Sequence, residues 1–199
     1  MYKVGITGGI GSGKSTVCEL LAEFGVALYD SDSRAKELMN SNEELKSQLI
    51  GCFGQECYTC GVLNRSWLAS RVFNSREQME RLNSIVHPAV MRDFVRWADE
   101  QTGDYVVLES AILFEAGLEC YVDATVAVMA PEELRLERAM QRDGATREEI
   151  LSRMRNQMND NERIERSTYA ILNISLEELS DEVIELHRRL CYDSKSRNH

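Results

Sequence analysis

Short apolar runs recur along the chain and predict the strands of a buried sheet. Most of them are continuously apolar rather than alternating, which is typical of strands covered on both faces in a parallel sheet. The five runs span Tyr2–Thr7, Val26–Asp30, Tyr105–Glu109, Ala124–Met129 and Tyr169–Leu172. Because helical patterns separate these runs, the sequence predicts an α/β fold with a five-stranded parallel sheet flanked by helices.

Two helices are predicted from their patterns in the second half of the chain. Near the carboxyl terminus, one apolar stripe at helical spacing consists of Leu176, Leu179, Val183, Leu186 and Leu190. The segment PEELRLERAMQRD begins with Pro131 at a first-turn position and carries acidic residues early, as helix starts do. We expect the terminal residues DSKSRNH to be disordered.

The stretch between the second and third runs is too long for a single crossover helix. Helical patterns run through SDSRAKELMNSNEELKSQLIGCF, SREQMERLNSIV and HPAVMRDFVRWADEQ. We therefore predict a mainly helical insertion at residues 31–103, within a core formed by residues 1–30 and 104–199. Residues 140–166 are polar and arginine-rich with few core anchors, which predicts a mobile helical flap within the core domain.

Charge and composition narrow the class of protein. The 199-residue chain carries a formal net charge of −10, which argues against a broad nucleic-acid surface, because phosphate-backbone binding needs clustered Lys and Arg. No run approaches the about 18 apolar residues of a membrane span, and the opening MYKVGI is too short for a signal peptide. We expect a cytoplasmic monomer or weak homo-oligomer with no nucleic-acid or membrane partner.

The six cysteines include one C-x-x-C pair, Cys57 and Cys60. A zinc site needs a second such pair or histidines at ligand spacing, whereas His87, His187 and His199 are far apart in the sequence. We interpret the cysteines as ordinary reduced thiols.

The first apolar run leads into GITGGIGSGKST, residues 5–16, which contains Gly8-x-x-x-x-Gly13-Lys14-Ser15. This is the P-loop pattern, in which backbone N–H groups cradle phosphate oxygens. Gly8 then allows the turn out of the strand, and Gly11, Ser12 and Gly13 bring the backbone close to phosphate. Lys14 reaches the β- and γ-phosphates, the Ser15 hydroxyl binds Mg²⁺, and Thr16 bonds the α-phosphate. A dinucleotide-binding fingerprint would need a third glycine where Lys14 stands.

A P-loop predicts a P-loop kinase fold or a related nucleotide-binding fold, but not the reaction. One alternative is a small-molecule kinase, and the other is a nucleotide-dependent switch or binding protein. The guanine signature N-K-x-D, and the D-x-x-G that precedes it in switch proteins, do not occur in this chain. A kinase needs an acceptor site, a base and a lid. The helical insertion at 31–103 and the flap at 140–166 match those needs.

Further segments make the resemblance specific. GITGGIGSGKST, YDSDSRAKEL, LNSIVHPAV, ILFEAGLE and AMQRDGATREEI, followed by RMRNQM and YAILN, resemble the successive signatures of dephospho-coenzyme A kinases, from about residue 3 to 174. That family uses ATP to phosphorylate the ribose 3′-hydroxyl of dephospho-coenzyme A, the last step of coenzyme A synthesis. The resemblance implies Mg-ATP as cofactor and dephospho-coenzyme A as substrate.

The resemblance also implies acceptor-side residues. Asp32 matches the residue regarded as general base, although an aspartate here also suits the N-cap of the helix that follows, and Asp30 suits either role. His87 follows LNSIV, as in the family, and is a candidate for substrate contact, the alternative being a turn or cap residue before proline. Arg34 and Arg92 are candidates for the acceptor's phosphates, the alternative being a solvated helix face.

Arginines at and just before the start of the flap form the other candidate group. Arg138 and Arg142 stand four apart on one helix and therefore share a face, from which they can clamp the transferring phosphoryl group or stack on adenine. Solvated surface arginines are the alternative. In the family Arg142 opens the lid, and Arg153 and Gln157 match lid positions. With Lys14 and Asp32, Arg142 is the third predicted catalytic residue.

The chain departs from the family at one position and leaves one assignment weak. Ala111 stands where the family usually has proline, so the loop after the third run is predicted to be less rigid. Glu109, at the end of that run, is a candidate to hold a magnesium-bound water, although aspartate is the more usual residue there.

Overall fold

The computed structural model describes residues 1–73 and 75–197, and it divides into two compact units. Unit 1 comprises Met1–Tyr29 and Trp97–His199, and unit 2 comprises Asp30–Arg96. The division follows the chain, because unit 2 is a single continuous insertion between two parts of unit 1. Each unit is described by itself below.

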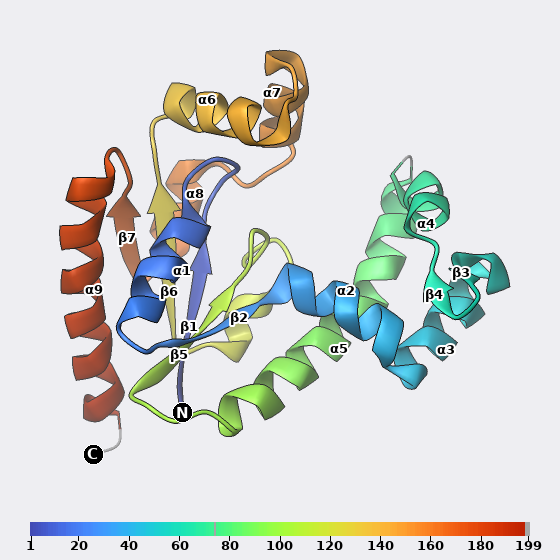
Figure 1. The fold of residues 1–199 in the computed structure, drawn as a ribbon, viewed down its shortest axis with the longest axis horizontal. Helices are drawn as coiled ribbons and strands as arrows, with labels where there is room; N and C mark the ends of the chain where they lie inside the picture. The colour runs from blue at the N-terminus through green and yellow to red at the C-terminus, as the bar shows by residue number, and fades with distance from the viewer. Residues whose placement is uncertain (74, 198–199) are drawn as a thin grey trace. The chain divides into compact units, whose positions relative to one another are not determined.

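Unit 1 is built on a five-stranded sheet with the order β2-β5-β1-β6-β7 (Figure 1). The strands are β1 (Tyr2–Thr7), β2 (Ala27–Asp30), β5 (Tyr105–Glu109), β6 (Ala124–Met129) and β7 (Tyr169–Leu172). The pairs β1–β5, β1–β6 and β6–β7 are parallel. The predicted α/β fold is confirmed, and the strand bounds differ from those expected by one residue, at the start of β2.

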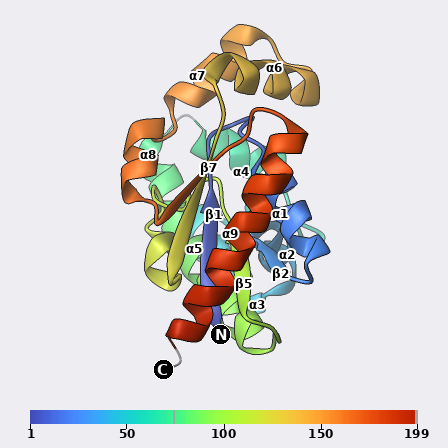
Figure 2. The ribbon, with the colours of Figure 1, turned by 90° about the vertical axis from the view of Figure 1, so that its left-hand side faces the viewer.

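Helices cover both faces of this sheet, which explains the continuously apolar strands. Figure 2 shows α1 (Lys14–Glu23) and α9 (Leu176–Ser196) on one side of the strands and α8 (Asp160–Arg166) on the other. The main core cluster joins β1, β5, β6 and β7 to α1 and α9. Val126, in the middle of β6, is completely buried. The sheet is therefore a rigid base for the loops at its carboxyl edge.

Helix α9 is longer than the sequence predicted. Leu179, Val183, Leu186 and Leu190 are buried as expected, but Leu176, at the first turn, is 64% exposed. The expectation of a disordered tail was wrong for residues 193–196, which continue the helix through Ser196. An ion pair of 3.1 Å between Lys195 and Asp104 anchors this last turn, and Ser194 is buried. Residues 198–199 lie outside the described residues.

Three helices follow β6: α6 (Glu132–Asp143), α7 (Arg147–Arg155) and α8. Pro131 directly precedes α6 as its N-cap rather than lying in the first turn. The flap predicted at 140–166 has more apolar anchors than its composition suggested. Ile150 of α7 is completely buried and clusters with Leu136 and Ala139 of α6.

Unit 2 is mainly helical. Its elements are α2 (Ser31–Ser41), α3 (Glu43–Phe53), a 3-10 turn (Gln55–Cys57), β3 (Tyr58–Thr59), β4 (Val62–Leu63), α4 (Arg65–Val72) and α5 (Arg76–Asp99), whose last residues belong to unit 1. The antiparallel β3–β4 hairpin was not predicted. Its turn residues Cys60 and Gly61 both have positive φ, 51° and 80°, as a type I′ turn requires.

Helix α5 excludes the alternative that His87 is a turn or cap residue before proline. The structure joins the two predicted helical segments into one helix of 24 residues that contains Pro88. Proline lacks the N–H that would bond the Ser84 carbonyl, so one bond of the helix ladder is missing there. Apolar contacts on both sides, including buried Val86, Ala89 and Val90, keep the helix continuous.

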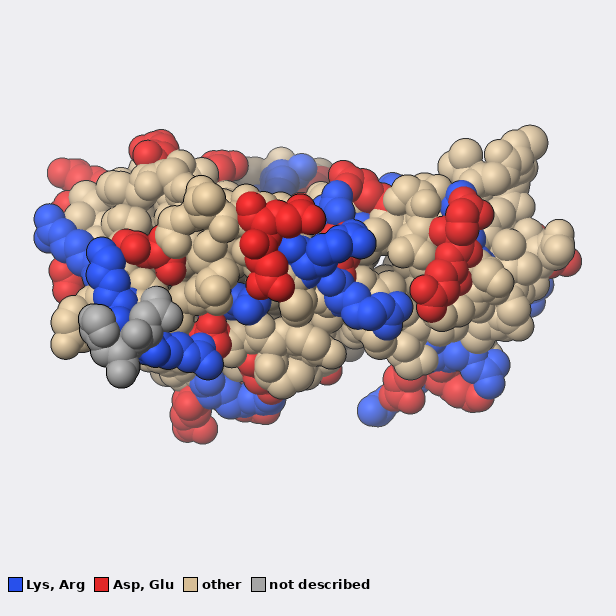
Figure 3. All heavy atoms as spheres, turned by 90° about the horizontal axis from the view of Figure 1, so that it is seen from below, with Lys and Arg blue, Asp and Glu red and all other residues tan. Residues whose placement is uncertain are grey.

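The six cysteines, all among the described residues, are free thiols, and residues 1–73 and 75–197 contain no cluster of metal-ligating side chains. In the same residues, no helix is both long and apolar enough to span a bilayer. Figure 3 shows basic and acidic side chains interspersed on the face it presents.

Candidate active site

The loop between β1 and α1 is shaped by glycines at its carboxyl half. Gly11 and Gly13 have positive φ values of 75° and 90°, which favour glycine, and Gly13 is the N-cap of α1. At Gly8, which was predicted to allow the turn out of the strand, the structure shows a requirement for a residue without a side chain. A Cβ there would lie 2.4 Å from the Val128 carbonyl oxygen. The loop thus presents backbone N–H groups at a helix N-terminus, which is the arrangement that holds phosphate.

Buried hydroxyls beside the loop support a phosphate-binding role. The Oγ1 of Thr7 and the Oγ of Ser12 are buried with no hydrogen-bond partner among the described residues. Buried polar groups are normally paired, so unpaired ones at a loop of this shape fit a site that is completed by a polar ligand.

Side chains at the start of α1 place a cation and oxygen ligands next to the loop. Lys14 Nζ donates to the Gly8 carbonyl at 3.0 Å, which holds the ammonium over the loop. Ser15 Oγ donates to Glu109 Oε1 at 3.0 Å, and Ser15 is exposed. Hydroxyl and carboxylate oxygens are the donors that Mg²⁺ prefers. The pair therefore fits magnesium, and the structure brings the weakly assigned Glu109 to the predicted metal ligand Ser15. Thr16 follows in the first turn of α1.

Asn173, directly after β7, links the P-loop to α6 and was not predicted. Its Nδ2 donates to the Ser12 carbonyl at 2.8 Å, and it is buried. Arg138 of α6 donates to the Ile174 carbonyl at 3.0 Å and to the Asn173 carbonyl at 3.3 Å. Arg138 therefore holds the loop after β7. The sequence signal that could have indicated Asn173 is the YAILN segment, which ends at this residue.

Arg142 and Arg153 are brought together on one carboxylate, that of Asp143. Arg142 Nε donates to Asp143 Oδ1 at 2.7 Å, and Arg153 Nη1 donates to Oδ2 at 2.6 Å. The hydrogen bond from Arg142, followed by the one from Arg153, lowers the pKa of Asp143 to about 2. The Arg142 side chain is 63% exposed, so it lies at the surface, where its hydrogen bonds go to Asp143.

Gln157 reaches the P-loop directly. Its Oε1 accepts a hydrogen bond of 2.8 Å from the Ile10 N–H, so the segment between α7 and α8 is tied to the loop between β1 and α1. Figures 1 and 2 agree in placing α6 and α7 above the end of the sheet where this loop lies. The predicted lid residues thus cover the carboxyl edge of the sheet.

In unit 2, Asp30 and Asp32 have different roles. Asp30 is the N-cap of α2: its Oδ1 accepts from the Asp32 N–H at 2.9 Å and from the Ser33 N–H at 3.3 Å. Asp32 lies in the first turn of the helix and is exposed. The cap that was one alternative for Asp32 is therefore supplied by Asp30.

The other acceptor-side candidates lie on α2 and α5. His87 is half-buried and faces the charge of Asp32: burial lowers the His87 pKa, and the nearby Asp32 carboxylate opposes that shift. Arg34 is engaged with buried Asp93, whose Oδ2 accepts from its Nη2 at 2.7 Å, and with Glu37 at 2.7 Å. Arg92 is exposed on α5. The structure therefore brings His87 and Asp32 together, whereas Arg34 is held by carboxylates.

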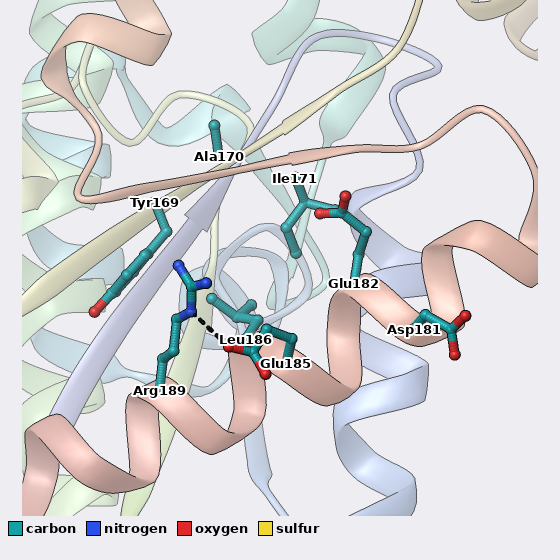
Figure 4. A pocket seen from close by; sticks show the side chains of 8 residues that line it. All are labelled: Tyr169, Ala170, Ile171, Asp181, Glu182, Glu185, Leu186 and Arg189. Carbon is teal, nitrogen blue, oxygen red and sulfur yellow. Dashed lines mark hydrogen bonds and ion pairs between the residues drawn. The ribbon is translucent and has the colours of Figure 1, made fainter.

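A groove of about 340 Å³ lies between β7 and α9, in a part of unit 1 that the sequence analysis did not single out (Figure 4). Its polar lining includes Arg189, whose Nε pairs with Glu185 Oε1 at 2.9 Å. It contains no P-loop residue. The groove therefore does not form part of the candidate active site.

Comparisons with known proteins agree with the P-loop geometry. The family model described as dephospho-CoA kinase matches residues 2–178. A dephospho-CoA kinase of Bacteroides fragilis is 41% identical over 185 residues, which is 92% of this chain and 90% of that protein. A crystal structure from Thermus thermophilus aligns with a TM-score of 0.83 and 36% identity, covering 94% of this chain and 96% of that one. Shikimate kinase of Acinetobacter baumannii, at 16% identity and a TM-score of 0.60, shares the fold over 97% of this chain and 94% of its own. The chain belongs to the dephospho-CoA kinase family.

Proposed function

We propose that this chain transfers the γ-phosphoryl group of Mg-ATP to the ribose 3′-hydroxyl of dephospho-coenzyme A, giving coenzyme A and ADP. The observation that carries the proposal is the glycine loop between β1 and α1, with Lys14 held over it and the Ser15–Glu109 oxygen pair beside it. Family membership supports the choice of acceptor. The reaction is the last step of coenzyme A synthesis.

The P-loop residues bind and orient the nucleotide in this proposal. Backbone N–H groups from Gly11 to Thr16 hold the phosphates, and Lys14 leaves the Gly8 carbonyl to neutralise charge on the β- and γ-phosphates. Ser15 would hold Mg²⁺ through its hydroxyl, and the Glu109 carboxylate beside it would help to hold the ion. When bound, Mg²⁺ supplies positive charge that offsets charge developing on the transferring group.

Asp32 is the proposed general base. Since Asp30 caps α2, the Asp32 carboxylate is exposed and is available to orient the 3′-hydroxyl and accept its proton. Half-buried His87 lies close enough to Asp32 for the two charges to interact, which supports a role beside the acceptor. Arg92 and Arg34 are proposed to bind acceptor phosphates, and for Arg34 this requires exchange of its bonds to Glu37.

The lid residues are proposed to close over the nucleotide. Arg142 and Arg153 share the Asp143 carboxylate, and phosphate oxygens would compete with it for their guanidinium groups. Arg138 of α6 is proposed to contact the nucleotide beside the loop after β7, to whose Ile174 carbonyl it donates a hydrogen bond.

We also propose that the protein works in the cytoplasm as a monomer or weak homo-oligomer. Six free thiols suit a reducing compartment.

Asp32→Asn tests the proposal, with Asp30→Asn as its matched control. Asn caps helices about as well as Asp, so both variants should fold with melting temperatures near that of the wild type. We expect Asp32→Asn to lower kcat by roughly 100-fold or more, with the Kd for ATP within a few-fold of wild type. Asp30→Asn should keep most of its kcat. If Asp32→Asn keeps most of its kcat, as Asp30→Asn is expected to, then Asp32 is not the general base.

A further inference from the structure

Arg135 of α6 packs directly on the P-loop, and the sequence analysis gave it no role. Its Nη1 lies 2.1 Å from the position that a Cβ on Gly9 would occupy, and its own carbonyl oxygen lies 2.1 Å from the corresponding position on Gly11. Arg135 is only 7% exposed. The space that side chains at two P-loop positions would need is therefore filled by one residue of α6, the helix that leads into the predicted lid.

The guanidinium of Arg135 is also joined to α8. Its Nη2 pairs with Asp160 Oδ2 at 3.0 Å, and Asp160 Oδ1 pairs with Arg163 Nη1 at 2.7 Å. Arg163 is completely buried, and its Nη2 donates to the Met158 carbonyl at 2.9 Å. Through Asp160, a contact on the P-loop is thus continuous with the helix at the far end of the lid.

Stability does not explain why a cation occupies this position. The Nε atoms of Arg135 and Arg163 are both buried without a hydrogen-bond partner among the described residues. An incompletely paired buried charge is weak support for a fold, and apolar residues of similar size often replace such charges without loss of stability. A role in the reaction therefore explains better than stability why a buried cation stands at position 135.

We propose that Arg135 is a positioning residue for phosphoryl transfer. Its side chain and carbonyl brace Gly9 and Gly11 from outside the loop, which holds the N–H groups in the phosphate-binding conformation. Its bond to Asp160 makes the position of α8 depend on the state of the loop. The inference rests on the proposed function only for its use of Mg-ATP, and it predicts an effect on nucleotide binding that is independent of the acceptor.

Arg135→Met tests this role by titration calorimetry with Mg-ATP and no acceptor. We expect the Kd to rise at least tenfold, with the KM for dephospho-coenzyme A changed less than threefold. Arg147→Met is the matched control, because Arg147, at the start of the next helix α7, makes an exposed ion pair with Glu133 of α6. A merely structural role would lower the melting temperature and leave the Kd of the folded protein unchanged. A folded Arg135→Met protein with a Kd within twofold of wild type overturns the proposal.

Three further variants keep the test decisive. If Arg135→Met does not fold, Arg135→Lys and Asp160→Asn replace it; each should raise the Kd at least threefold, and wild-type values for both overturn the proposal. Gly9→Ala should weaken Mg-ATP binding by displacing the guanidinium, and this effect should largely vanish in the Arg135→Met background. Full additivity would contradict the contact. Wild-type protein that fails to bind Mg-ATP contradicts the proposed function instead.

Discussion

Lys14 illustrates how single residues of the P-loop serve a ligand rather than the fold. Its ammonium donates to the Gly8 carbonyl at 3.0 Å, and the first buried residues of α1 are Val17 and Cys18. Loss of the side chain therefore removes a cation from the phosphate site without opening a cavity in the core.

We expect Lys14→Ala to abolish measurable phosphoryl transfer, since the lysine neutralises charge on the transferring group. The melting temperature should stay within a few degrees of wild type. Lys195→Ala is the control, because Lys195 makes an exposed ion pair at the end of α9 and such pairs contribute about 1 kcal/mol or less. Substantial turnover by a folded Lys14→Ala protein would show that the loop is not the ATP site.

His87 gives a residue-scale prediction about pH. Burial lowers its pKa from the usual 6.5, so the folded state holds the neutral imidazole while the unfolded chain takes up a proton. Stability from this group is complete above about pH 6.5 and is lost as the pH falls from there through the lower folded pKa. Denaturant unfolding between pH 7 and pH 5 should therefore show falling stability.

The His87→Gln variant should show a shallower fall over the same range. His187, whose pKa is also lowered by burial, contributes a separate part that His187→Gln should remove. An unchanged pH slope in His87→Gln would mean that the imidazole is protonated equally in both states.

The roles of single residues could be predicted where a motif fixes the backbone conformation. They were harder to predict where contacts with neighbouring residues determine the role. The P-loop glycines, Lys14 and Ser15 follow from one pattern. The division of work between Asp30 and Asp32 does not, because both suit an N-cap and only the start of α2 decides which one is used. Arg135 was missed because its role depends on a contact with Gly9 that helical spacing does not reveal.

The elements of the sheet were predictable because each strand is a short, largely apolar run. The central strands β1, β5 and β6 are buried along most of their length, whereas the edge strands β2 and β7 are only partly buried. The same reasoning failed in unit 2. The β3–β4 hairpin has two residues in each strand, too few for any period, and its turn uses Cys60 rather than Asn or Asp at positive φ. His87 before Pro88 suggested a turn or cap as one alternative, yet α5 runs through both residues. Local signals thus fail where packing overrides them.

The lid is the element with the clearest energetic prediction. Ile150 is completely buried in the small cluster that joins α7 to α6. Ile150→Ala should cost about 2–5 kcal/mol of local stability, as large-to-small core substitutions do. Because this cluster is separate from the main core, the loss should appear as faster amide exchange in α6 and α7, with exchange in β1 and β6 unchanged.

Leu151→Ala is the control, since Leu151 lies on the same helix and is only partly buried. It should cause a smaller increase in exchange. Equal acceleration across the sheet in Ile150→Ala would show that the lid is not an independent cooperative unit.

The whole molecule combines an α/β unit that carries the P-loop with a helical unit inserted after β2. The chain passes from the first unit to the second at the YDSDS segment. Asp30 ends β2 and caps α2, and Asp32 follows two residues later. Because the net charge is −10 and acidic side chains stand among the basic ones in Figure 3, we assign phosphate binding to specific cations, Lys14 and the arginines of α6. This arrangement suits a small anionic substrate.

The most direct test of the account is acceptor-dependent ADP release by the purified chain with Mg-ATP. Dephospho-coenzyme A is compared with a panel of nucleosides and nucleotides, and the product is identified by mass spectrometry. We predict one ADP and one coenzyme A per turnover, with much slower release for the other acceptors. A folded protein that binds Mg-ATP but releases no additional ADP with dephospho-coenzyme A would contradict the account.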